Sequence, residues 1–343
     1  MEKIFYQHPD ILYIMELPHE SEKDIVYKKT TIVEETISFI GKEEKVLIEQ
    51  PIRVTKRYFD DLGPGLTTGA ADDDPSGIAT YSQTGAQFGF SLAWMALFTL
   101  PFMAVVEEMC ARIGLVTGEG LAANIRKHYS KKALYGITSL LFIANTFNIA
   151  ADISAMAAAM KLLLPHIPFL VFVAGFGILC VVLQIFIPYA RYAKYLKYMT
   201  LSLLAYIVVA FLVDINWTTV AIDTLIPSVT FSKEQLILIS AIFGTTISPY
   251  LFFWQTSQEV EEKINLGETS IAKRKKDVSD AQMKKMRTDV WSGMFFSNLI
   301  MFFIIITCGA TLYVSGITNI ETADQAAQAL RPIAGRFSSL IFA

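Results

Sequence analysis

The stretch GPGLTTGAADDDPSGIATYSQTGAQFGF, residues 63–90, decides the fold of this chain. Its length and its many small, uncharged residues suit a membrane-spanning helix, which needs about 20 mostly apolar residues. Yet Asp72, Asp73 and Asp74 stand in its middle, and Pro75 follows directly. A carboxylate at the centre of a membrane helix costs about 2.5 to 3.5 kcal/mol on insertion scales. Three adjacent carboxylates therefore cannot face lipid.

Pro75 indicates that this helix is interrupted. Proline lacks a backbone N–H, and it disfavours helical backbone at the preceding residue, Asp74. Gly69 and Gly77 are expected to loosen the chain on either side. Non-helical backbone in mid-membrane is tolerated only where it lines a polar cavity or is buried in protein. We therefore predict a helix that is broken in mid-membrane, with free carbonyls and amides facing a cavity.

The composition is that of an all-α, multi-pass membrane protein. Hydrophobic residues make up 53% of the 343 residues and charged residues only 18%, against about 25% charged residues in a soluble domain. The mean hydropathy is +0.43. A net charge of −3 gives no reason to expect a nucleic-acid partner. Three single cysteines in apolar segments indicate buried thiols rather than a disulfide framework or a zinc site.

The chain divides into a polar N-terminal extension, residues 1–60, and a transmembrane domain, residues 61–343. The extension alternates apolar and polar residues, which suits short strands or a disordered tail without chemistry of its own. In the domain we predict seven spans and the start of an eighth, near 62–88, 90–112, 133–163, 168–188, 195–214, 235–258, 289–315 and from 326. Residues 259–288 form the one long polar connection.

Lysine and arginine alternate between the two sides of the predicted membrane. Nine precede span 1, five lie between spans 2 and 3, three between spans 4 and 5, and eight between spans 6 and 7, so 25 of 29 fall on one side. The positive-inside rule places that side, and the N-terminus, in the cytoplasm. Near the cytoplasmic end of span 2, we expect Glu107 and Glu108 to form a salt bridge with Arg112 rather than an ion site.

A second interruption is predicted in span 6, in SAIFGTTISPYLFFW, residues 240–254. Gly244, Thr245, Ser248 and Pro249 lie about as far into span 6 as Asp74 lies into span 1. Two interrupted helices in matching positions of two halves are typical of transporters built from inverted repeats, with the substrate bound between the breaks.

The residues at both breaks resemble the Nramp family of divalent-metal transporters. GPG at 63–65 followed by Asp74-Pro75 is similar to the family's first helix, whose motif is Asp-Pro-Gly-Asn. EEMCARIGLVTGEGLAANIR, residues 107–126, is similar to the stretch that joins its helices 2 and 3. GTTISPY, residues 244–250, aligns with its helix-6 motif Gly-Ala-Asn-Ile-Met-Pro-His. The resemblance, from about residue 60 to 343, implies a LeuT-type bundle of five plus five helices with helices 1 and 6 broken.

The resemblance also implies which residues meet the transported ion. The candidate metal ligands are Asp74, Gly77, Thr245 and Ser248. The candidates for a second shell or a proton route are Asp72, Asp73, Asp152 and Tyr250, of which Asp152 falls where the family carries an acid in helix 3.

Several positions depart from the family's pattern. The family's helix-6 methionine is Ser248, its neighbouring histidine is Tyr250, and its second helix-6 histidine is Gln255. Its helix-3 glutamate is Ala155. Without the thioether, an all-oxygen set remains, which favours hard ions such as magnesium, calcium and manganese. Losing both histidines and the glutamate removes the usual proton carriers, and Asp152 is left as a lone candidate relay.

We therefore expect transport of manganese, iron or magnesium by alternating access in a bacterial-type inner membrane, with the metal ion and the lipid bilayer as partners. No nucleophile–base pair, P-loop or Gly-rich dinucleotide turn is present, so neither an enzyme nor a bound cofactor is expected. One alternative is a sodium-coupled symporter of a small organic solute on the same fold, although three acids at the break would repel an anionic substrate. The other is a metal-sensing receptor with residues 1–60 as its output domain. The sequence does not indicate an oligomeric state.

The end of the sequence carries a further expectation. The first five spans occupy residues 62–214, whereas the chain stops at Ala343 inside the apolar run SSLIFA. A five-plus-five bundle needs ten spans, so we predict a fragment that lacks most of span 8 and spans 9 and 10. Such a fragment is not expected to transport by itself.

Overall fold

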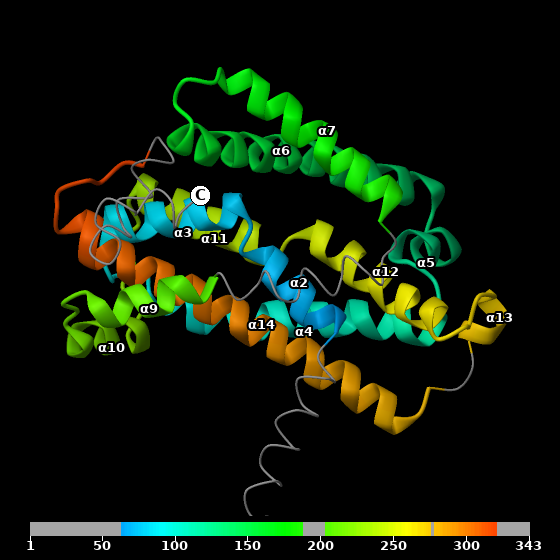
Figure 1. Ribbon diagram of the computed structural model, residues 1–343. Coiled ribbons are helices and arrows are strands. Elements are labelled where there is room, and N and C mark those ends of the chain that lie inside the picture. The colour runs from blue at the N-terminus through cyan, green and yellow to red at the C-terminus, as the bar shows by residue number, and fades with distance from the viewer. Residues whose placement is uncertain (1–62, 188–202, 276–277, 321–343) are drawn as a thin grey trace, which may run out of the picture. The chain divides into compact units, whose positions relative to one another are not determined.

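The computed structural model describes residues 63–187, 203–275 and 278–320, and these ranges contain helices and no strand (Figure 1). The first half comprises α2 (Pro64–Asp72), α3 (Pro75–Phe88), α4 (Trp94–Thr117), α5 (Leu121–His128), α6 (Lys131–Leu163) and α7 (Phe169–Phe186). The second comprises α9 (Leu204–Leu212), α10 (Trp217–Leu225), α11 (Lys233–Thr246), α12 (Pro249–Asn265), α13 (Ile271–Arg274), α14 (Asp280–Cys308) and the π-helical turn η2 (Gly309–Tyr313). The predicted all-α class is confirmed. The N-terminal extension and the predicted eighth span lie outside the described residues.

Helices long and apolar enough to cross a membrane support the multi-pass prediction. Five such segments occur among the described residues, at Trp94–Thr117, Lys131–Leu163, Phe169–Phe186, Lys233–Asn265 and Asp280–Tyr313. They match the predicted spans 2, 3, 4, 6 and 7. The first predicted span is divided into α2 and α3, both too short to cross alone. Of the fifth predicted span, only α9 and its flanking residues are described.

The connections are more helical than predicted. The polar residues 259–288 were expected to form one connection, but α12 continues through them to Asn265 and α14 already begins at Asp280. A capping box explains the early start of α14, because the Ser279 side chain and the Gln282 side chain each bond the other's backbone N–H. The short helices α5, α10 and α13 were not predicted, since none has the length or apolarity of a span.

The first helix is interrupted at Asp73 and Asp74. Helix α2 ends at Asp72, Asp74 has extended backbone (φ −69°, ψ 172°), and α3 starts at Pro75. Proline suits the first position of a helix because its fixed φ is helical and its missing N–H is not needed there. The Asp74 carboxylate caps the new helix by accepting a hydrogen bond of 2.8 Å from the N–H of Gly77.

The second interruption lies between α11 and α12, and it is stabilised differently. Ser248 is extended (φ −87°, ψ 128°) before Pro249, but its side chain caps no amide of α12. Its hydroxyl instead donates to the carbonyls of Gly244, at 2.7 Å, and Thr245, at 2.8 Å. Ser248 therefore satisfies the end of α11, whereas Asp74 satisfies the beginning of α3.

Glycines bring α2 and α14 into backbone contact. A Cβ added at Gly69 would lie 2.3 Å from the carbonyl oxygen of Gly293, and one at Gly293 would lie 2.0 Å from the carbonyl oxygen of Gly65. One at Gly65 would lie 2.6 Å from the Val290 backbone. Gly69 was expected to loosen the chain. It lies inside α2 instead, and its missing side chain allows close packing.

Asp289 of α14 fixes the start of α2. Its Oδ1 accepts hydrogen bonds from the N–H groups of Gly63, at 2.7 Å, and Leu66, at 3.2 Å. Its Oδ2 accepts one from the N–H of Gly65, at 2.7 Å. Pro64 has no N–H to satisfy. A buried carboxylate at the positive end of a helix is stabilised by both the hydrogen bonds and the helix dipole.

We predict that Gly293→Ala destabilises the protein. The new methyl group would overlap the Gly65 carbonyl, and overpacking of this kind costs about 1 to 3 kcal/mol. Thermal unfolding in detergent should show a lower midpoint than wild type. Gly136→Ala in α6 is the matched control, because nothing lies within 4 Å of its Cβ position and alanine favours a helix. Equal midpoints for both variants would contradict the packing described.

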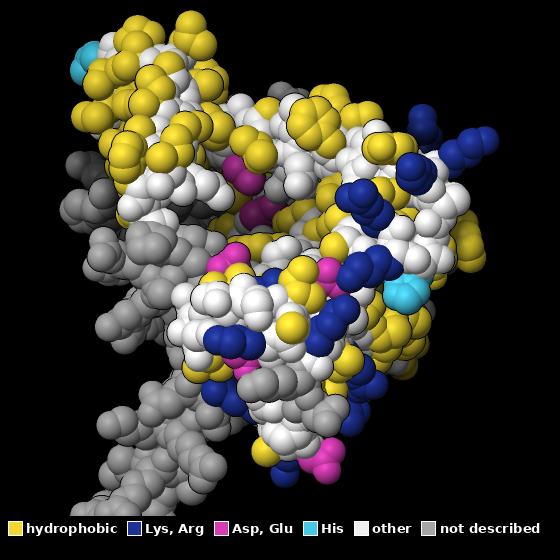
Figure 2. All heavy atoms as spheres, turned by 90° about the vertical axis from the view of Figure 1, so that its right-hand side faces the viewer, with side chains coloured by type: hydrophobic (Ala, Val, Ile, Leu, Met, Phe, Trp, Pro, Cys, Tyr) yellow, Lys and Arg dark blue, Asp and Glu magenta, His cyan; other side chains and the backbone are white. Residues whose placement is uncertain are grey.

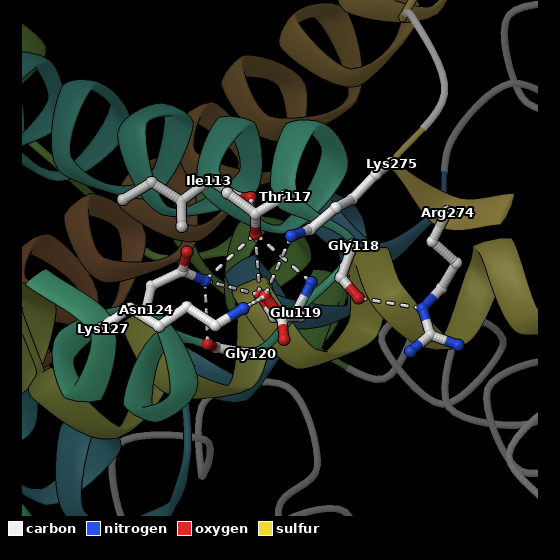
Figure 3. A network of polar contacts seen from close by, with 9 residues as sticks. All are labelled: Ile113, Thr117, Gly118, Glu119, Gly120, Asn124, Lys127, Arg274 and Lys275. Carbon is white, nitrogen blue, oxygen red and sulfur yellow. Dashed lines mark hydrogen bonds and ion pairs between the residues drawn. The ribbon is translucent and has the colours of Figure 1, made fainter. Parts of the chain in front are cut away.

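A polar network closes the turn between α4 and α5 (Figure 3). Gly118 ends α4 with a left-handed backbone (φ +64°), which glycine adopts without strain. The Thr117 hydroxyl accepts from the N–H of Glu119, at 3.3 Å, and from the amide of Asn124, at 3.0 Å. The same amide nitrogen donates to the carbonyls of Glu119 and Gly120. This turn therefore has a defined conformation although it is a connection.

The same turn is joined to α13 across a long sequence separation. The Nε of Arg274 donates to the Gly118 carbonyl at 2.8 Å. Lys127 forms an ion pair with Glu119, and the Lys275 Nζ lies 3.9 Å from the same Oε2 of that carboxylate. The hydrogen bond from Lys127, together with the charges of Lys127, Lys275 and Arg274, lowers the pKa of Glu119 below its ordinary value.

We predict a pH-dependent effect of Glu119→Gln. Because folding lowers the pKa of Glu119, its ion pairs stabilise the protein at pH values above the ordinary glutamate pKa of about 4.3. This contribution is lost as the pH falls through the lowered pKa. The variant should be less stable than wild type at pH 7, by less than about 1 kcal/mol, and the difference should vanish in acid. Thermal unfolding from pH 7 to 3 measures it, with Glu234→Gln as an exposed control. A difference independent of pH would argue against the ion pairs.

Candidate functional site

Asp74 stands at the centre of the site. Its Oδ1 accepts hydrogen bonds from the Ser76 hydroxyl, at 2.6 Å, and from the N–H of Gly77, at 2.8 Å. Both donors belong to the first turn of α3, so this oxygen is held by its own segment. The carboxylate is only half-buried, and its other oxygen faces away from that turn toward two further helices.

The second oxygen of Asp74 joins the broken helix to α6 and α12. Its Oδ2 accepts from the Asn148 amide, at 2.9 Å, and from the Tyr250 hydroxyl, at 3.1 Å. The same Asn148 nitrogen lies 3.4 Å from Oδ2 of Asp152, one turn further along α6. Three segments far apart in the sequence therefore meet at one carboxylate.

Gly77 and Thr245 lie against each other beside this carboxylate. A Cβ at Gly77 would stand 3.5 Å from the Thr245 Oγ1 and 2.7 Å from the Asp72 carbonyl oxygen. Glycine is thus required for the close approach of α3 to the end of α2 and to α11. The Thr245 hydroxyl is buried and has no hydrogen-bond partner among the described residues. Its hydrogen-bonding capacity is therefore unused within the described residues.

Asp72 and Asp73 lie apart from the contacts of Asp74. The Asp72 side chain is fully buried, and its Oδ2 accepts from the Ser297 hydroxyl of α14 at 2.8 Å. The Asp73 side chain is 4% exposed, and neither of its oxygens has a hydrogen-bond partner within the described ranges. Their carboxylates make no hydrogen bond to the groups that surround Asp74.

The two glutamates of α4 differ in their surroundings. Glu108 forms the expected salt bridge with Arg112, at 2.6 Å, and it also accepts from the Trp291 indole, at 2.7 Å, and pairs with Arg287, at 3.2 Å. Glu107 is fully buried, and neither of its oxygens has a hydrogen-bond partner in the part of the chain that the structure describes. The expected ion pair therefore holds for Glu108 but not for Glu107.

The structure brings together most of the residues that the sequence singled out. Asp74 accepts a hydrogen bond from Tyr250, and the Asn148 amide joins it to Asp152. Gly77 lies against Thr245, and the Ser248 hydroxyl donates to the carbonyls that end α11. Among the described residues, no group of three or more His, Cys, Asp or Glu side chains could hold a metal ion. A cation here would therefore rely on one carboxylate with hydroxyl, amide and carbonyl oxygens.

The sequence analysis missed Asn148. Asparagine is common at surfaces and helix ends, and this one carries no motif. One signal was present, however, because Asn148 precedes Asp152 by four residues within a predicted span, and that spacing puts both on one face of a helix. Polar residues inside a membrane span usually face the bundle interior.

A hollow with acidic side chains is visible on one face of the molecule (Figure 2). Hydrophobic side chains line much of its rim, and Lys and Arg side chains gather beside it, on the side of the molecule where Figure 1 shows α5 and α13. A polar interior within an apolar surface is what a cavity for a cation in a membrane requires.

The Nramp family model, described as natural resistance-associated macrophage protein-like, matches residues 65–343. The chain belongs to this family. It is 24% identical over 289 residues to the divalent metal cation transporter MntH of Aeromonas hydrophila, covering 82% of this chain and 67% of that protein. It is 30% identical over 212 residues to the manganese transporter pdt1 of Schizosaccharomyces pombe, covering 58% of this chain and 40% of that one.

Solved structures confirm the fold of this Nramp chain. It superposes on the manganese transporter of Eremococcus coleocola with a TM-score of 0.61 and 17% sequence identity, covering 84% of this chain and 66% of that one. The predicted LeuT-type helical bundle is therefore correct. The chain spans about two thirds of the length of the MntH and Eremococcus proteins that it matches.

Proposed function

We propose that this protein transports divalent metal cations across a membrane and binds the ion at Asp74, Gly77, Thr245 and Ser248. The observation that carries the proposal is the Asp74 carboxylate, which stands at a helix break and is approached by α6 and α12. Membership of the Nramp family and the names of the relatives, which all speak of metal ions, support it over the symport of an organic solute.

The donor atoms at the site favour a hard ion. Asp74 supplies a carboxylate, Thr245 and Ser248 supply hydroxyls, and the C-terminal end of α11 supplies backbone carbonyls. Each of these candidate metal ligands is an oxygen. Magnesium and manganese prefer such ligands over thioether or thiolate. With a single carboxylate and few rigid ligands, the site suits an ion that keeps part of its water shell, as magnesium does. Iron is the third candidate ion.

Few side chains at this site could carry a proton during transport. Tyr250 and Gln255 occupy the positions of the two helix-6 histidines that the resemblance implies, and Ala155 that of the glutamate. Asp152 is half-buried near Asp74 and is the one nearby acid of α6. We therefore propose metal transport that does not require a proton gradient, with Asp72 and Asp73 as buried neighbours of the site rather than ligands of the ion.

The orientation follows from the basic residues. We propose an inner membrane of the bacterial type with the N-terminus in the cytoplasm, because 25 of 29 Lys and Arg residues precede span 1 or lie in alternate connections. Alternating access would then open the site first to the outside and next to the basic face of Figure 2. The two helix breaks are where the helices can bend during that change.

Uptake into proteoliposomes tests the proposed function. The protein is expressed from its complete reading frame, purified and reconstituted, and entry of magnesium, manganese, iron and cadmium is compared with and without a pH gradient. We expect magnesium or manganese to enter in both conditions. Failure of all four ions to enter faster than into empty liposomes would refute the proposal, and uptake only with a pH gradient would refute the uncoupled mode. Glycine uptake serves to test the symporter alternative.

We predict that Asp74→Ala abolishes metal uptake while the protein stays folded, because the ion loses the carboxylate that stands at the helix break. Asp74→Asn separates binding from capping, since an asparagine can still cap α3 but carries no charge. Uptake should fall by roughly 10-fold to 100-fold or more in both variants. Asp280→Asn, at the exposed start of α14, is the matched control. Wild-type uptake by Asp74→Ala would exclude this site.

We predict that Ser248→Met shifts selectivity toward soft ions. A thioether would replace the hydroxyl, and sulfur ligands prefer cadmium to magnesium. Titration calorimetry with both ions should show a higher ratio of cadmium to magnesium affinity than in wild type. Ser248→Ala is the control that removes the hydroxyl, and its bonds to the α11 carbonyls, without adding sulfur. An unchanged ratio in Ser248→Met would mean that residue 248 does not touch the ion.

A further inference from the structure

Asn148 bridges two carboxylates in the middle of α6. Its Nδ2 lies 2.9 Å from Oδ2 of Asp74 and 3.4 Å from Oδ2 of Asp152. A side-chain amide nitrogen has two N–H groups, so it can donate to both acids at once. The partially positive NH₂ group thus stands between two negative groups, at the place where a cation would be most strongly attracted.

The amide oxygen takes no part in these two bonds. Asparagine carries a carbonyl oxygen beside its nitrogen, and rotation about χ2 exchanges the two groups over a broad, roughly two-fold torsional profile. A divalent ion at Asp74 would repel the NH₂ group and attract the oxygen. The same residue can therefore serve the ion-free and the ion-bound state with different atoms.

Two side-chain oxygens of candidate site residues, one on α6 and one on α11, carry no hydrogen bond within the described part of the chain. Oδ1 of Asp152 has no hydrogen-bond partner among the described residues, and neither has the hydroxyl of Thr245. On Asp74, the oxygen that meets Asn148 is also the one that faces α12, through Tyr250. An ion that binds this oxygen competes with the Asn148 N–H and the Tyr250 O–H, because both donate to its lone pairs.

We propose that Asn148 contacts the transported ion and helps to select it. Its Oδ1 acts as an oxygen ligand from α6 to the hydrated ion, which is a hard divalent cation such as magnesium. This inference rests on the proposed transport function and adds α6 to a site otherwise built from the break between α2 and α3 and the break between α11 and α12. A carboxamide oxygen is a hard ligand, so Asn148 favours magnesium over cadmium.

Two substitutions at 148 test the proposal by calorimetric titration of the purified protein with magnesium and with cadmium. Asn148→Leu has nearly the same volume and no polar atom. It should weaken magnesium binding by about 10-fold to 100-fold and weaken cadmium binding less, so that the ratio of cadmium to magnesium affinity rises. Asn148→Asp keeps an oxygen in the same place and adds a charge, and it should bind magnesium at least as tightly as wild type.

Thr146→Val is the matched control, because Thr146 lies on the same helix, is exposed, and has its hydroxyl bonded to the Phe142 carbonyl of its own helix. It should bind both ions like wild type. Wild-type affinities in Asn148→Leu would overturn the proposal. So would equal loss for both ions, which indicates a structural role, or loss of magnesium binding in Asn148→Asp. If the wild-type protein bound neither ion, the proposed function would fail. If the wild-type protein bound both ions and Asn148→Leu bound them equally well, only the role of Asn148 would be refuted.

Discussion

A single carboxylate performs two tasks in this molecule. Asp74 caps the helix that Pro75 starts, and with its other oxygen it accepts from Asn148 and Tyr250. A buried helix end without such an acceptor would leave backbone amides unsatisfied in a region that excludes water. The start of α3, the approach of α6 and the approach of α12 therefore share one side chain, and an ion bound there would act on all three segments.

The two helix breaks are satisfied with opposite polarity. At the first, an acidic side chain accepts from an amide, and the vicinity is negative before any ion arrives. At the second, the Ser248 hydroxyl donates to carbonyls, so its hydrogen is already engaged while its lone pairs remain. A cation at the proposed site would meet a charge on one side and neutral oxygens on the other, which is a chemical asymmetry that a hard, partly hydrated ion tolerates.

Sequence reasoning predicted the elements that follow from local chemistry. The interruption at Asp74 and the one at Ser248 follow from proline and its effect on the preceding residue, and the long spans follow from apolar length. What it could not predict depends on packing between distant segments. Gly69 was interpreted as a flexible joint because its contact with α14 is not visible in sequence, and the role of Asn148 required the partner that α3 brings to it.

The contact between α2 and α14 has a mechanical consequence. Helices that slide past one another do so over a layer of side chains that can change rotamers. Between Gly69 and Gly293 there is no such layer, and Asp289 fastens the adjacent end through three amides. The two helices therefore behave as one rigid lever. We infer that, when the protein changes shape, the bending falls on the unwound residues Asp73 and Asp74, so that the hinge would include Asp74, the first of the proposed ion ligands.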